Sequence, residues 1–336
     1  MDTLERAYGA QKPRGGNTLV IFYITVLRAM AACLITNAHY TGVYPTDLIA
    51  NGGLIGDIIF FAVSGYCLCN VKLPFVRWYG KRVYRIYIPV AVITGIYALL
   101  GFYRISTGNW FSWFVFPTYY HFVASIILLY IPFYIVVTNR WTRKHLGVVM
   151  LFTAIVWLVV YVVAYDTSHY HIDNVHEPMI RFLFFESMLL GAYFKSCDEE
   201  MRKQFHMVDL VAVIILMAVY FASKICFSRM DAIVNLQFIN QLVIFALLFE
   251  IMRLFAGLDH ALNALPASIK KVIHMISEMT LEIYLVQYVI IDQMRAVFFF
   301  PVNWIVLTAT ILISAYVLHY VCASVYRVID AVTRKV

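Results

Sequence analysis

The chain has 336 residues, of which 62% are hydrophobic and only 13% are charged, and its formal net charge is +7. A soluble domain usually carries about a quarter charged residues, so this composition excludes an ordinary soluble protein. The long apolar runs also exclude a β-barrel, whose strands alternate apolar and polar residues over about ten positions. The composition therefore predicts an all-α fold, a polytopic bundle of membrane helices.

The apolar segments predict about ten transmembrane helices. Residues 1–18 are polar, so we expect a cytoplasmic N-terminal tail and no cleavable signal peptide. Residues 19–328 are predicted to form the membrane domain and residues 329–336 a cytoplasmic C-terminal tail. The expected crossings are Leu19–Tyr40, Leu54–Val71, Tyr84–Phe102, Tyr120–Thr138, Leu146–Tyr165, Ile180–Phe194, Val208–Phe227, Leu236–Phe255, Glu278–Phe299 and Val302–Val325. The sixth is short, and the ninth contains two acidic residues.

The placement of Lys and Arg supports both termini on the cytoplasmic side. With that orientation, twenty of the 26 basic residues fall in cytoplasmic tails and loops, four fall in outer loops, and Arg28 and Arg181 lie within spans. Short cytoplasmic loops normally carry this excess of positive charge. The charge therefore follows the inner leaflet of the membrane, and it requires no nucleic-acid partner.

Arg28 and His39 are the most informative pair in the first span. Eleven residues at 100° per residue return to within about 20° of the starting direction, so both side chains share one helix face, about 16 Å apart along the axis. Such side chains are costly inside a membrane unless they face a cavity or a partner. Imidazole can exchange a proton with a hydroxyl, and arginine binds phosphate or carboxylate. The alternative is an arginine that snorkels inward and a histidine at the outer interface.

The second span begins with a stretch rich in glycine, residues 52–66, that contains Asp57 and Ser64. Glycine and serine allow two membrane helices to approach closely, so a packing face is one interpretation. Asp57 at the outer start of the span could orient His39 or lie in water. Asp57 or Ser64 could also stabilise a developing negative charge.

Arg82 and Arg85 lie where the second inner loop enters the third span. They are three residues apart and share a helix face. Two guanidinium groups at an inner membrane surface suit the phosphates of a nucleotide-bearing donor. For either arginine alone, a role in topology or contact with lipid headgroups fits equally well.

Taken together, these segments resemble the acyltransferase-3 family of integral membrane acyltransferases. The resemblance rests on Arg28 and His39 with ten residues between them, on Phe60-Phe61-Ala62-Val63-Ser64-Gly65, on Arg82-x-x-Arg85 and on Arg85-x-x-x-Pro89, in this order. Later stretches that resemble the family are Tyr130-Ile131-Pro132, residues 188–191 and residues 280–287. Many members end the last of these motifs in histidine, where this chain has Gln287.

The resemblance implies transfer of an acyl group, most often acetyl from acetyl-CoA, to a hydroxyl of a surface glycan or lipid-linked oligosaccharide. We therefore expect a multi-pass O-acetyltransferase in a bacterial plasma or inner membrane, with acetyl-CoA or another acyl-CoA as donor. His39 is the expected general base, with Asp57 and Ser64 as further catalytic candidates. Arg82, Arg85 and the deeper Arg28 are expected to bind the donor. The sequence specifies neither the acyl group nor the acceptor. It is compatible with direct transfer and with a relay through an acyl-enzyme.

Two other functions fit parts of the sequence. A transporter or flippase for a lipid-linked sugar or small acid would line its path with polar residues in the spans, although no inverted repeat is evident. A membrane scaffold for polysaccharide assembly would tolerate replacement of Arg28 and His39. We expect no metal site, because the spacing of His169, His171 and His176 in the third outer loop favours a solvated loop over zinc ligands.

Overall fold

The computed structural model describes residues 21–197 and 205–333, and in this part of the chain all regular secondary structure is helical, with no strand. The predicted N-terminal tail, residues 1–18, lies outside the described residues. The elements are α2 (Phe22–Ala38), α3 (Gly53–Leu68), α4 (Phe75–Leu99), the π-helix η1 (Phe111–Val115), α5 (His121–Thr138), α6 (Arg140–Lys144), α7 (Leu146–Ala164), α8 (Ile180–Ser196), α10 (Met207–Arg229), the 3₁₀ helix η2 (Asp231–Leu236), α11 (Phe238–Gly257), α12 (Asp259–Asn263), α13 (Ala267–Glu278), α14 (Thr280–Met294) and α15 (Val302–Thr333).

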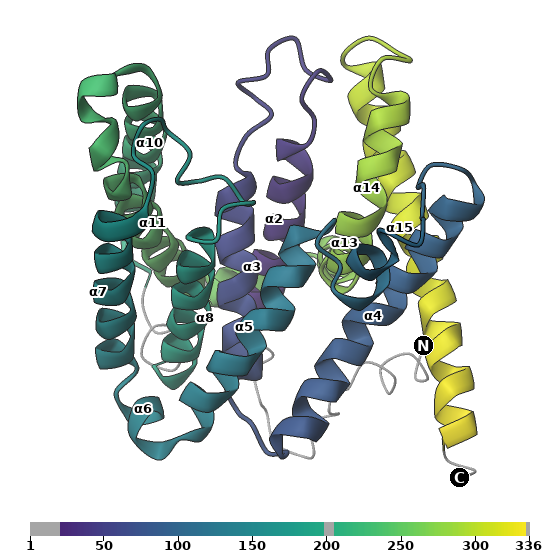
Figure 1. Cartoon of the computed structure of the whole chain (residues 1–336), viewed down its shortest axis with the longest axis horizontal. Coiled ribbons are helices and arrows are strands. Elements are labelled where there is room, and N and C mark those ends of the chain that lie inside the picture. Colours follow the sequence, from purple (N-terminus) through teal and green to yellow (C-terminus); the bar gives the residue numbers. More distant parts are fainter. Residues whose placement is uncertain (1–20, 198–204, 334–336) are drawn as a thin grey trace.

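The long helices stand side by side and alternate in direction (Figure 1). We call the end that carries segments 39–52, 230–237 and 295–301 the upper end, as drawn in Figure 1, and the end that carries segments 69–74 and 139–145 the lower end. The segment between α4 and α5 turns back toward the middle of the bundle, so α5 begins below the upper end.

Each predicted crossing contains one helix of the structure, but the helices differ in length. Among the described residues, six are long and apolar enough to span a membrane: α4, α5, α7, α10, α11 and α15. α2 and α3 are shorter apolar helices. α8 and α14, with 17 and 15 residues, correspond to the sixth and ninth predicted crossings. Glu278 ends the separate helix α13, and α15 continues into the segment predicted as the C-terminal tail.

α3 and α8 form the closest helix pair at the centre of the bundle. A Cβ atom on Gly65 would lie 1.9 Å from the carbonyl oxygen of Met188, and one on Gly191 would lie 1.8 Å from that of Ala62. The two backbones therefore touch at two points, which small residues permit in membrane helices. Just above, the rings of Phe61 and Phe184 stack with their centroids 4.3 Å apart.

α2 packs against the other side of α3 through a second glycine. A Cβ on Gly56 would lie 2.9 Å from the carbonyl oxygen of Ala31. The lower end of α2 is held by Asp259, whose Oδ1 accepts hydrogen bonds from the backbone N–H groups of Phe22 and Tyr23, both at 2.9 Å. Backbone N–H groups at a helix start carry partial positive charge and have no partner within the helix, so a carboxylate stabilises them. Both contacts set the height and rotation of α2.

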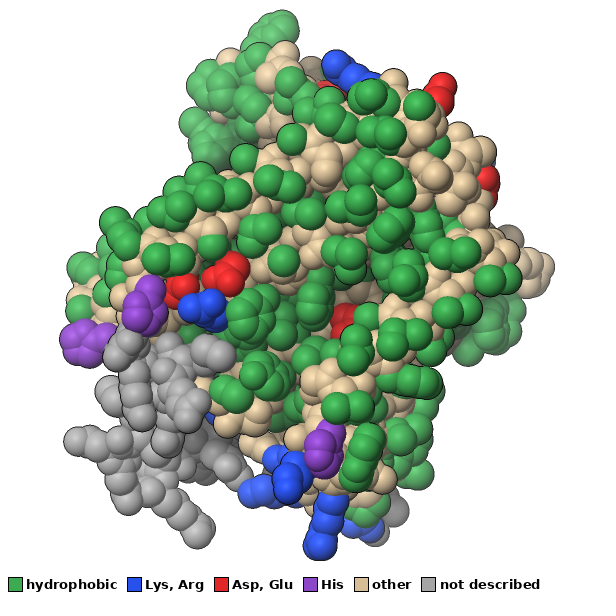
Figure 2. Space-filling view, turned by 90° about the vertical axis from the view of Figure 1, so that its left-hand side faces the viewer, with side chains coloured by type: hydrophobic (Ala, Val, Ile, Leu, Met, Phe, Trp, Pro, Cys, Tyr) green, Lys and Arg blue, Asp and Glu red, His purple; other side chains and the backbone are tan. Residues whose placement is uncertain are grey.

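α7, α10 and α11 form one flank of the bundle. Arg253 of α11 makes an ion pair with Asp209 of α10, with 2.9 Å between Nη2 and Oδ1. Nearer the upper end, Asn240 of α11 donates a hydrogen bond to the hydroxyl of Ser223 of α10. The outward surface of this flank is mainly hydrophobic (Figure 2), as expected for side chains in contact with lipid tails.

We predict that Gly65→Ala and Gly191→Ala strongly destabilise the protein. The added methyl group would meet a backbone carbonyl, which cannot rotate away, so the cost should be at least about 3 kcal/mol, the upper end of ordinary overpacking. Thermal unfolding of the purified protein in detergent measures this. Gly95→Ala in α4 is the control, because its Cβ would meet no atom within 4 Å. Equal melting temperatures for all three variants would contradict the proposed backbone contact.

Candidate active site

A cavity of about 280 Å³ lies in the upper half of the bundle, between α2, α3, α5, α8, α10 and α14. Its walls bring together five charged or titratable groups from separate parts of the chain, along with three tyrosines. These residues are His39, Asp57, His121, Asp173, Lys224, Tyr220, Tyr284 and Tyr288. Two of the residues predicted from the sequence, His39 and Asp57, therefore lie in one cavity. We call it the upper cavity.

His39 directly follows the last turn of α2, and its backbone N–H donates to the carbonyl of Thr36 at 3.1 Å. The imidazole is half-buried and meets the ring of Tyr288 edge-on, with centroids 4.9 Å apart. The carboxylate that acts electrostatically on His39 is that of Asp292, one helical turn beyond Tyr288 on α14. Tyr288 therefore limits the orientation of the imidazole.

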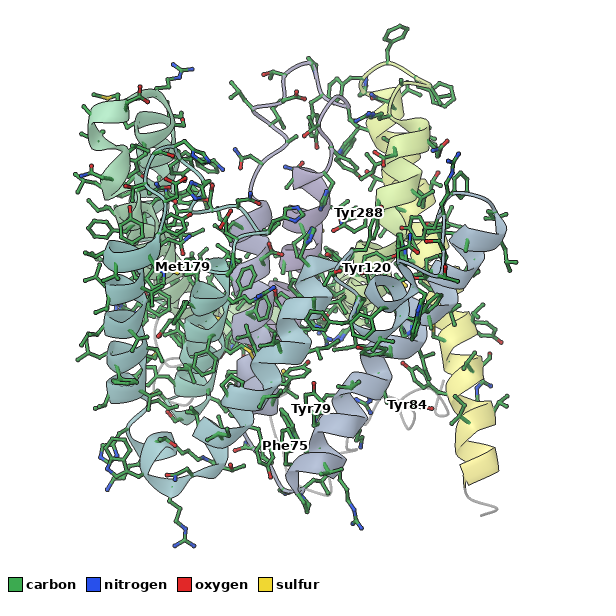
Figure 3. All side chains as sticks on the ribbon, viewed as in Figure 1. Phe75, Tyr79, Tyr84, Tyr120, Met179 and Tyr288 are labelled. Carbon is green, nitrogen blue, oxygen red and sulfur yellow. The ribbon has the colours of Figure 1, made fainter. Side chains whose placement is uncertain are left out.

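Asp57 faces the upper cavity from the first turns of α3 and is only 7% exposed. The charge of Asp57 acts on the phenol groups of Tyr220, Tyr284 and Tyr288. Figure 3 shows Tyr288 near α14 and above Tyr120, toward the centre of the bundle. Asp57 is thus a carboxylate among phenols, in the same cavity that His39 lines.

Three residues of the upper cavity were not singled out as site residues from the sequence. Lys224 of α10 and Asp173 of the α7–α8 loop make an ion pair with 2.5 Å between Nζ and Oδ2. His121 begins α5, and its ring lies 3.8 Å from that of His176. Each pair joins segments more than 50 positions apart in the chain, so no local motif could have indicated it.

The loop that carries Asp173 is held by Gln237, which is fully buried. Its Oε1 accepts hydrogen bonds from the backbone N–H groups of His171 and Ile172, and its Nε2 donates to the carbonyl of His169. Three hydrogen bonds from one side chain fix this part of the loop, because an unmade bond in a buried position is costly. The wall of the upper cavity is therefore rigid where Asp173 enters it.

A second group of functional candidates lies toward the lower end. Arg28 of α2, Arg82 of α4 and Lys195 of α8 all act electrostatically on Cys67, which is exposed at the end of α3. Arg28 and Arg82 also act on Tyr130 of α5. The charges of three cations from three helices thus reach the same thiol, and we call Arg28, Arg82 and Lys195 the lower cation cluster.

The cations of this cluster are held in different ways. Nζ of Lys195 donates to the hydroxyl of Tyr66 at 3.3 Å and lies over its ring. The guanidinium of Arg82 lies over the ring of Trp78, and its buried Nε has no hydrogen-bond partner among the described residues. A buried donor without a partner is expensive, which fits a site that an anionic group completes. Arg85 lies next to Arg82 and acts on it electrostatically.

Ser64 lies seven residues after Asp57 on α3, which places it about 10 Å lower along the helix. It does not line the upper cavity. It is three residues from Cys67 and therefore faces the side of α3 that meets the lower cation cluster. The structure thus groups His39 with Asp57 at one level, and Ser64 with the arginines at the other.

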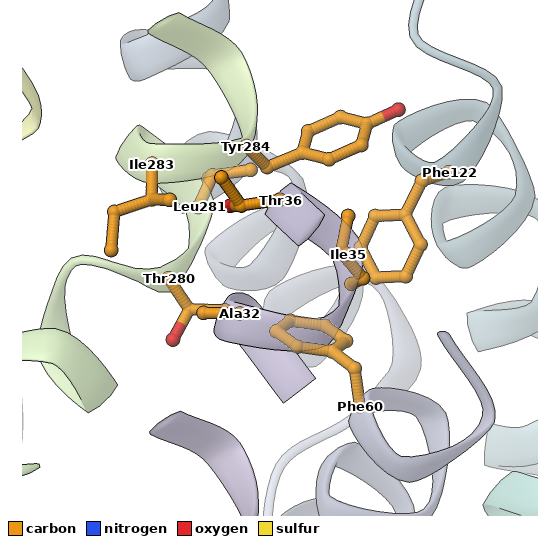
Figure 4. A pocket seen from close by; sticks show the side chains of 9 residues that line it. All are labelled: Ala32, Ile35, Thr36, Phe60, Phe122, Thr280, Leu281, Ile283 and Tyr284. Atoms are coloured by element: carbon orange, nitrogen blue, oxygen red, sulfur yellow. The ribbon is translucent and has the colours of Figure 1, made fainter. Parts of the chain in front are cut away.

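Tightly packed side chains lie between the two levels, and we call this zone the constriction. Along the face of α2 from Arg28 to His39 lie Ala32, Ile35 and Thr36. Together with residues of α3, α5 and α14, they line a void of only about 10 Å³, about the size of one water molecule. Figure 4 shows the side chains that close it: Ala32, Ile35, Thr36, Phe60, Phe122, Thr280, Leu281, Ile283 and Tyr284.

The histidines of the third outer loop do not converge. His169 and His171 stack on each other, with centroids 4.2 Å apart, whereas His176 packs on His121. Across residues 21–197 and 205–333 no group of three or more His, Cys, Asp or Glu side chains is arranged to hold a metal ion. The backbone N–H of Ser168 donates to Asp166 and lowers the pKa of that exposed carboxyl.

Gln287, the last residue of the stretch 280–287 singled out from the sequence, is fully buried in α14. Neither its Oε1 nor its Nε2 has a hydrogen-bond partner among the described residues. It does not line the upper cavity.

Comparison with protein families identifies a match over most of the chain. The model of the acyltransferase-3 family, described as an acyltransferase domain, matches residues 21–324. The chain belongs to the acyltransferase-3 family. The comparisons with curated proteins and with solved structures find no match.

Membership of the acyltransferase-3 family gives the chain a general function, that of an integral membrane acyltransferase with an acyl donor and an acceptor. An enzyme of this kind has to bring two substrates to one reaction centre. The acyltransferase described here has two candidate regions for them, the upper cavity with its imidazoles and carboxylates, and the lower cation cluster.

The constriction makes a prediction about access from the two sides. In a variant without other cysteines, a charged thiol reagent should label Cys67 from the lower face only, and Ala50→Cys, in the wall of the upper cavity, from the upper face only. The reason is that the packed side chains of the constriction lie between the two cysteines. Labelling of proteoliposomes with one-sided addition measures this, and labelling of either cysteine from both faces would disprove the constriction.

Proposed function

We propose that the protein is a membrane O-acyltransferase that moves an acyl group, most simply acetyl from acetyl-CoA, to a hydroxyl of a carbohydrate at the cell envelope. The observation that carries the proposal is the geometry of α2. This one helix presents Arg28 to the lower cation cluster and His39 to the upper cavity, and the residues of the constriction lie between them on the same face. This face of α2 would thus connect a region that binds anions, at Arg28, to a proton acceptor, His39.

The orientation and number of crossings belong to the same proposal. The lower end, with Lys72, Arg143 and Lys144 in its loops, would face the cytoplasm, and the upper end, with Arg229 and Arg295, would face outward. All ten long segments would cross the membrane, with α2, α3, α8 and α14 as short crossings inside the bundle. Acyl-CoA is a cytoplasmic metabolite, so the cation cluster would then lie on the side from which the donor comes.

The donor would bind with its phosphates at Arg28, Arg82 and Lys195, with Arg85 beside them. The unpartnered Nε of Arg82 supports this assignment, because a phosphate oxygen would satisfy it. The pantetheine arm would run past Cys67 and Ser64 and through the constriction toward His39. The rings of Phe60 and Phe122 therefore have to shift when the donor enters.

In the upper cavity, His39 would act as general base. A ring nitrogen takes the proton of the acceptor hydroxyl, and the oxygen attacks the carbonyl carbon of the thioester. The carbon–sulfur bond then breaks, the new ester forms, and the proton passes from His39 to the departing CoA thiolate. Asp292 would stabilise the imidazolium, and the phenols of Tyr284 and Tyr288 lie in the same cavity as donors for the developing oxyanion.

The acceptor would reach His39 from the upper end. The wall of the upper cavity offers both hydrogen-bond donors and acceptors. They come from the ion pair of Asp173 and Lys224, from the side-chain amide of Asn51 and from the imidazole of His121. A sugar presents hydroxyls that both donate and accept hydrogen bonds, so a polar wall of mixed character suits it.

We predict that His39→Ala lowers acyl transfer by about 100-fold or more, the usual contribution of a general base. His39→Gln should be equally inactive, since it keeps a polar side chain of similar reach but cannot accept the proton. Incorporation of labelled acetyl into envelope carbohydrate, analysed by mass spectrometry, measures this. His145→Ala is the matched control, because His145 lies in the α6–α7 connection at the lower end. Transfer at full level by His39→Ala, with normal amounts of folded protein, would defeat the assignment.

We also predict that CoA protects Cys67 from alkylation. A donor held by Arg28, Arg82 and Lys195 would cover this thiol, so CoA should slow its reaction with N-ethylmaleimide. Arg82→Gln should raise the CoA concentration needed for protection by about tenfold or more, as expected for one charge-assisted hydrogen bond.

The control for this experiment is Cys226, which is exposed in the last turn of α10 toward the upper end. CoA should leave its alkylation unchanged. Equal protection of Cys67 and Cys226, or no protection of Cys67 at CoA concentrations that inhibit transfer, would argue against donor binding at the lower cation cluster.

A further inference from the structure

A groove on the flank of the bundle is not used by the proposed reaction. It lies between α7, α8 and α11, has a volume of about 220 Å³, and is almost entirely apolar in its lining. The apolar residues include Met150, Leu151, Trp157, Phe182, Leu242 and Phe245. We call it the flank groove. Two polar residues also line it, Glu186 and Gln241.

The flank groove opens sideways, toward the membrane. Leu151 and Leu242 at its rim are 63% and 52% exposed. The surrounding surface of α7 and α11 is apolar, and Figure 2 shows acidic atoms at the bottom of a recess among hydrophobic side chains on this flank. In a membrane, the molecules that meet such an opening are lipids, because the groove has no aqueous neighbour at this depth.

Gln241 lies near the upper end of the groove, and Glu186 lies deeper, beside Thr153 of α7. Gln241 is three residues from the upper start of α11, and Glu186 is six residues from the upper start of α8, about 5 and 9 Å along the helices. Met150 lies fourteen residues from the upper end of α7, about 21 Å down. The groove therefore runs from the interfacial level of the upper leaflet into its hydrocarbon core, as a lipid chain does.

Both polar residues present acceptors to an occupant. Gln241 is 4% exposed; its Nε2 donates to the carbonyl of Ile172 at 2.9 Å, and its Oε1 has no partner among the described residues. Glu186 is 9% exposed and accepts a hydrogen bond from the hydroxyl of Thr153. A buried oxygen without a donor is costly, and an occupant with a hydrogen-bond donor would remove that cost.

We propose that the flank groove binds one acyl chain of an upper-leaflet lipid that carries a free hydroxyl beside the chain, as a diacylglycerol does. The chain lies among the apolar residues of α7 and α11, and the hydroxyl donates to Oε1 of Gln241 or to Glu186. An ordinary phospholipid offers ester carbonyls at this level, which are acceptors and leave Gln241 unpaired.

The same side chain connects the groove to the upper cavity. Gln241 holds the carbonyl of Ile172, and the next residue, Asp173, lines the cavity and pairs with Lys224. α8 separates the two spaces, with Phe184 in the cavity wall and Phe182 in the groove wall. A lipid in the groove thus contacts the anchor of the loop that shapes the cavity. The binding proposal itself does not depend on the chemistry proposed for His39.

The test uses a diacylglycerol with a photoreactive diazirine in one acyl chain, in phosphatidylcholine vesicles that contain the full-length protein. After irradiation, peptides from α7, α8 and α11 that line the groove should carry the label. The same probe with its hydroxyl methylated should label them roughly three- to tenfold less, the range expected for one buried hydrogen bond. Unlabelled diacylglycerol should compete with the probe.

Ala154→Phe, which fills the groove, should abolish the labelling, whereas Val148→Phe on the exposed surface of the same helix should leave it unchanged. Labelling spread evenly over the flank and insensitive to Ala154→Phe would overturn the site. Equal labelling by the hydroxyl and methylated probes would overturn the role of Gln241 and Glu186. The competition experiment needs no variant, so it decides the proposal even if Ala154→Phe does not fold.

Discussion

The contact between the backbones of α3 and α8 is the constraint on which the rest of the structure depends. Gly65 and Gly191 lie reciprocally against the carbonyls of Met188 and Ala62, so neither helix can rotate or slide without losing both contacts. Because lipid tails are as apolar as leucine, burial alone gives membrane helices little reason to associate, and close packing has to supply the attraction. In the Phe-Phe-x-x-Ser-Gly stretch that resembles the acyltransferase-3 family, the glycine therefore has a structural task. It fixes the helix that carries Asp57, Phe60 and Cys67.

α2 and α3 lie side by side and run in opposite directions, so the position of a residue along either helix gives its depth in the bundle. On α2 the order from the lower to the upper end is Arg28, Ala32 and His39, and on α3 it is Cys67, Phe60 and Asp57. Gly56 brings the two helices into contact at the level of Ala31, so equal depths on the two helices face the same space. Under the proposed mechanism, the spacing of eleven residues between Arg28 and His39 would be the distance between the level that binds the donor phosphates and the level that accepts the proton.

Much of the fold could be predicted, because a membrane helix must satisfy its backbone internally and shows this as a long apolar run. Each predicted crossing contains a helix. The boundaries were wrong where polarity and helicity diverge: α4 begins at Phe75, nine residues before the predicted Tyr84, because basic residues at its start are as helical as apolar ones. For the site, the shared face of Arg28 and His39 could be read from helical period. The sequence could not indicate Lys195, Asp173 or Asp292 as site residues. They come near the site only because segments distant in the chain pack together.

The constriction also gives a reason for the division of the site into two levels. An acyl thioester is stable until it meets an activated nucleophile, and water that reached it beside a general base would compete with the acceptor. Apolar side chains at Ile35, Phe60 and Phe122 separate the imidazole from the lower aqueous side when no donor fills the passage. A donor chain that enters between these rings would itself keep the passage closed to water and ions. Under the proposed mechanism, the same few side chains would guide the acyl group to His39 and keep the membrane sealed, so the enzyme would need no separate gate.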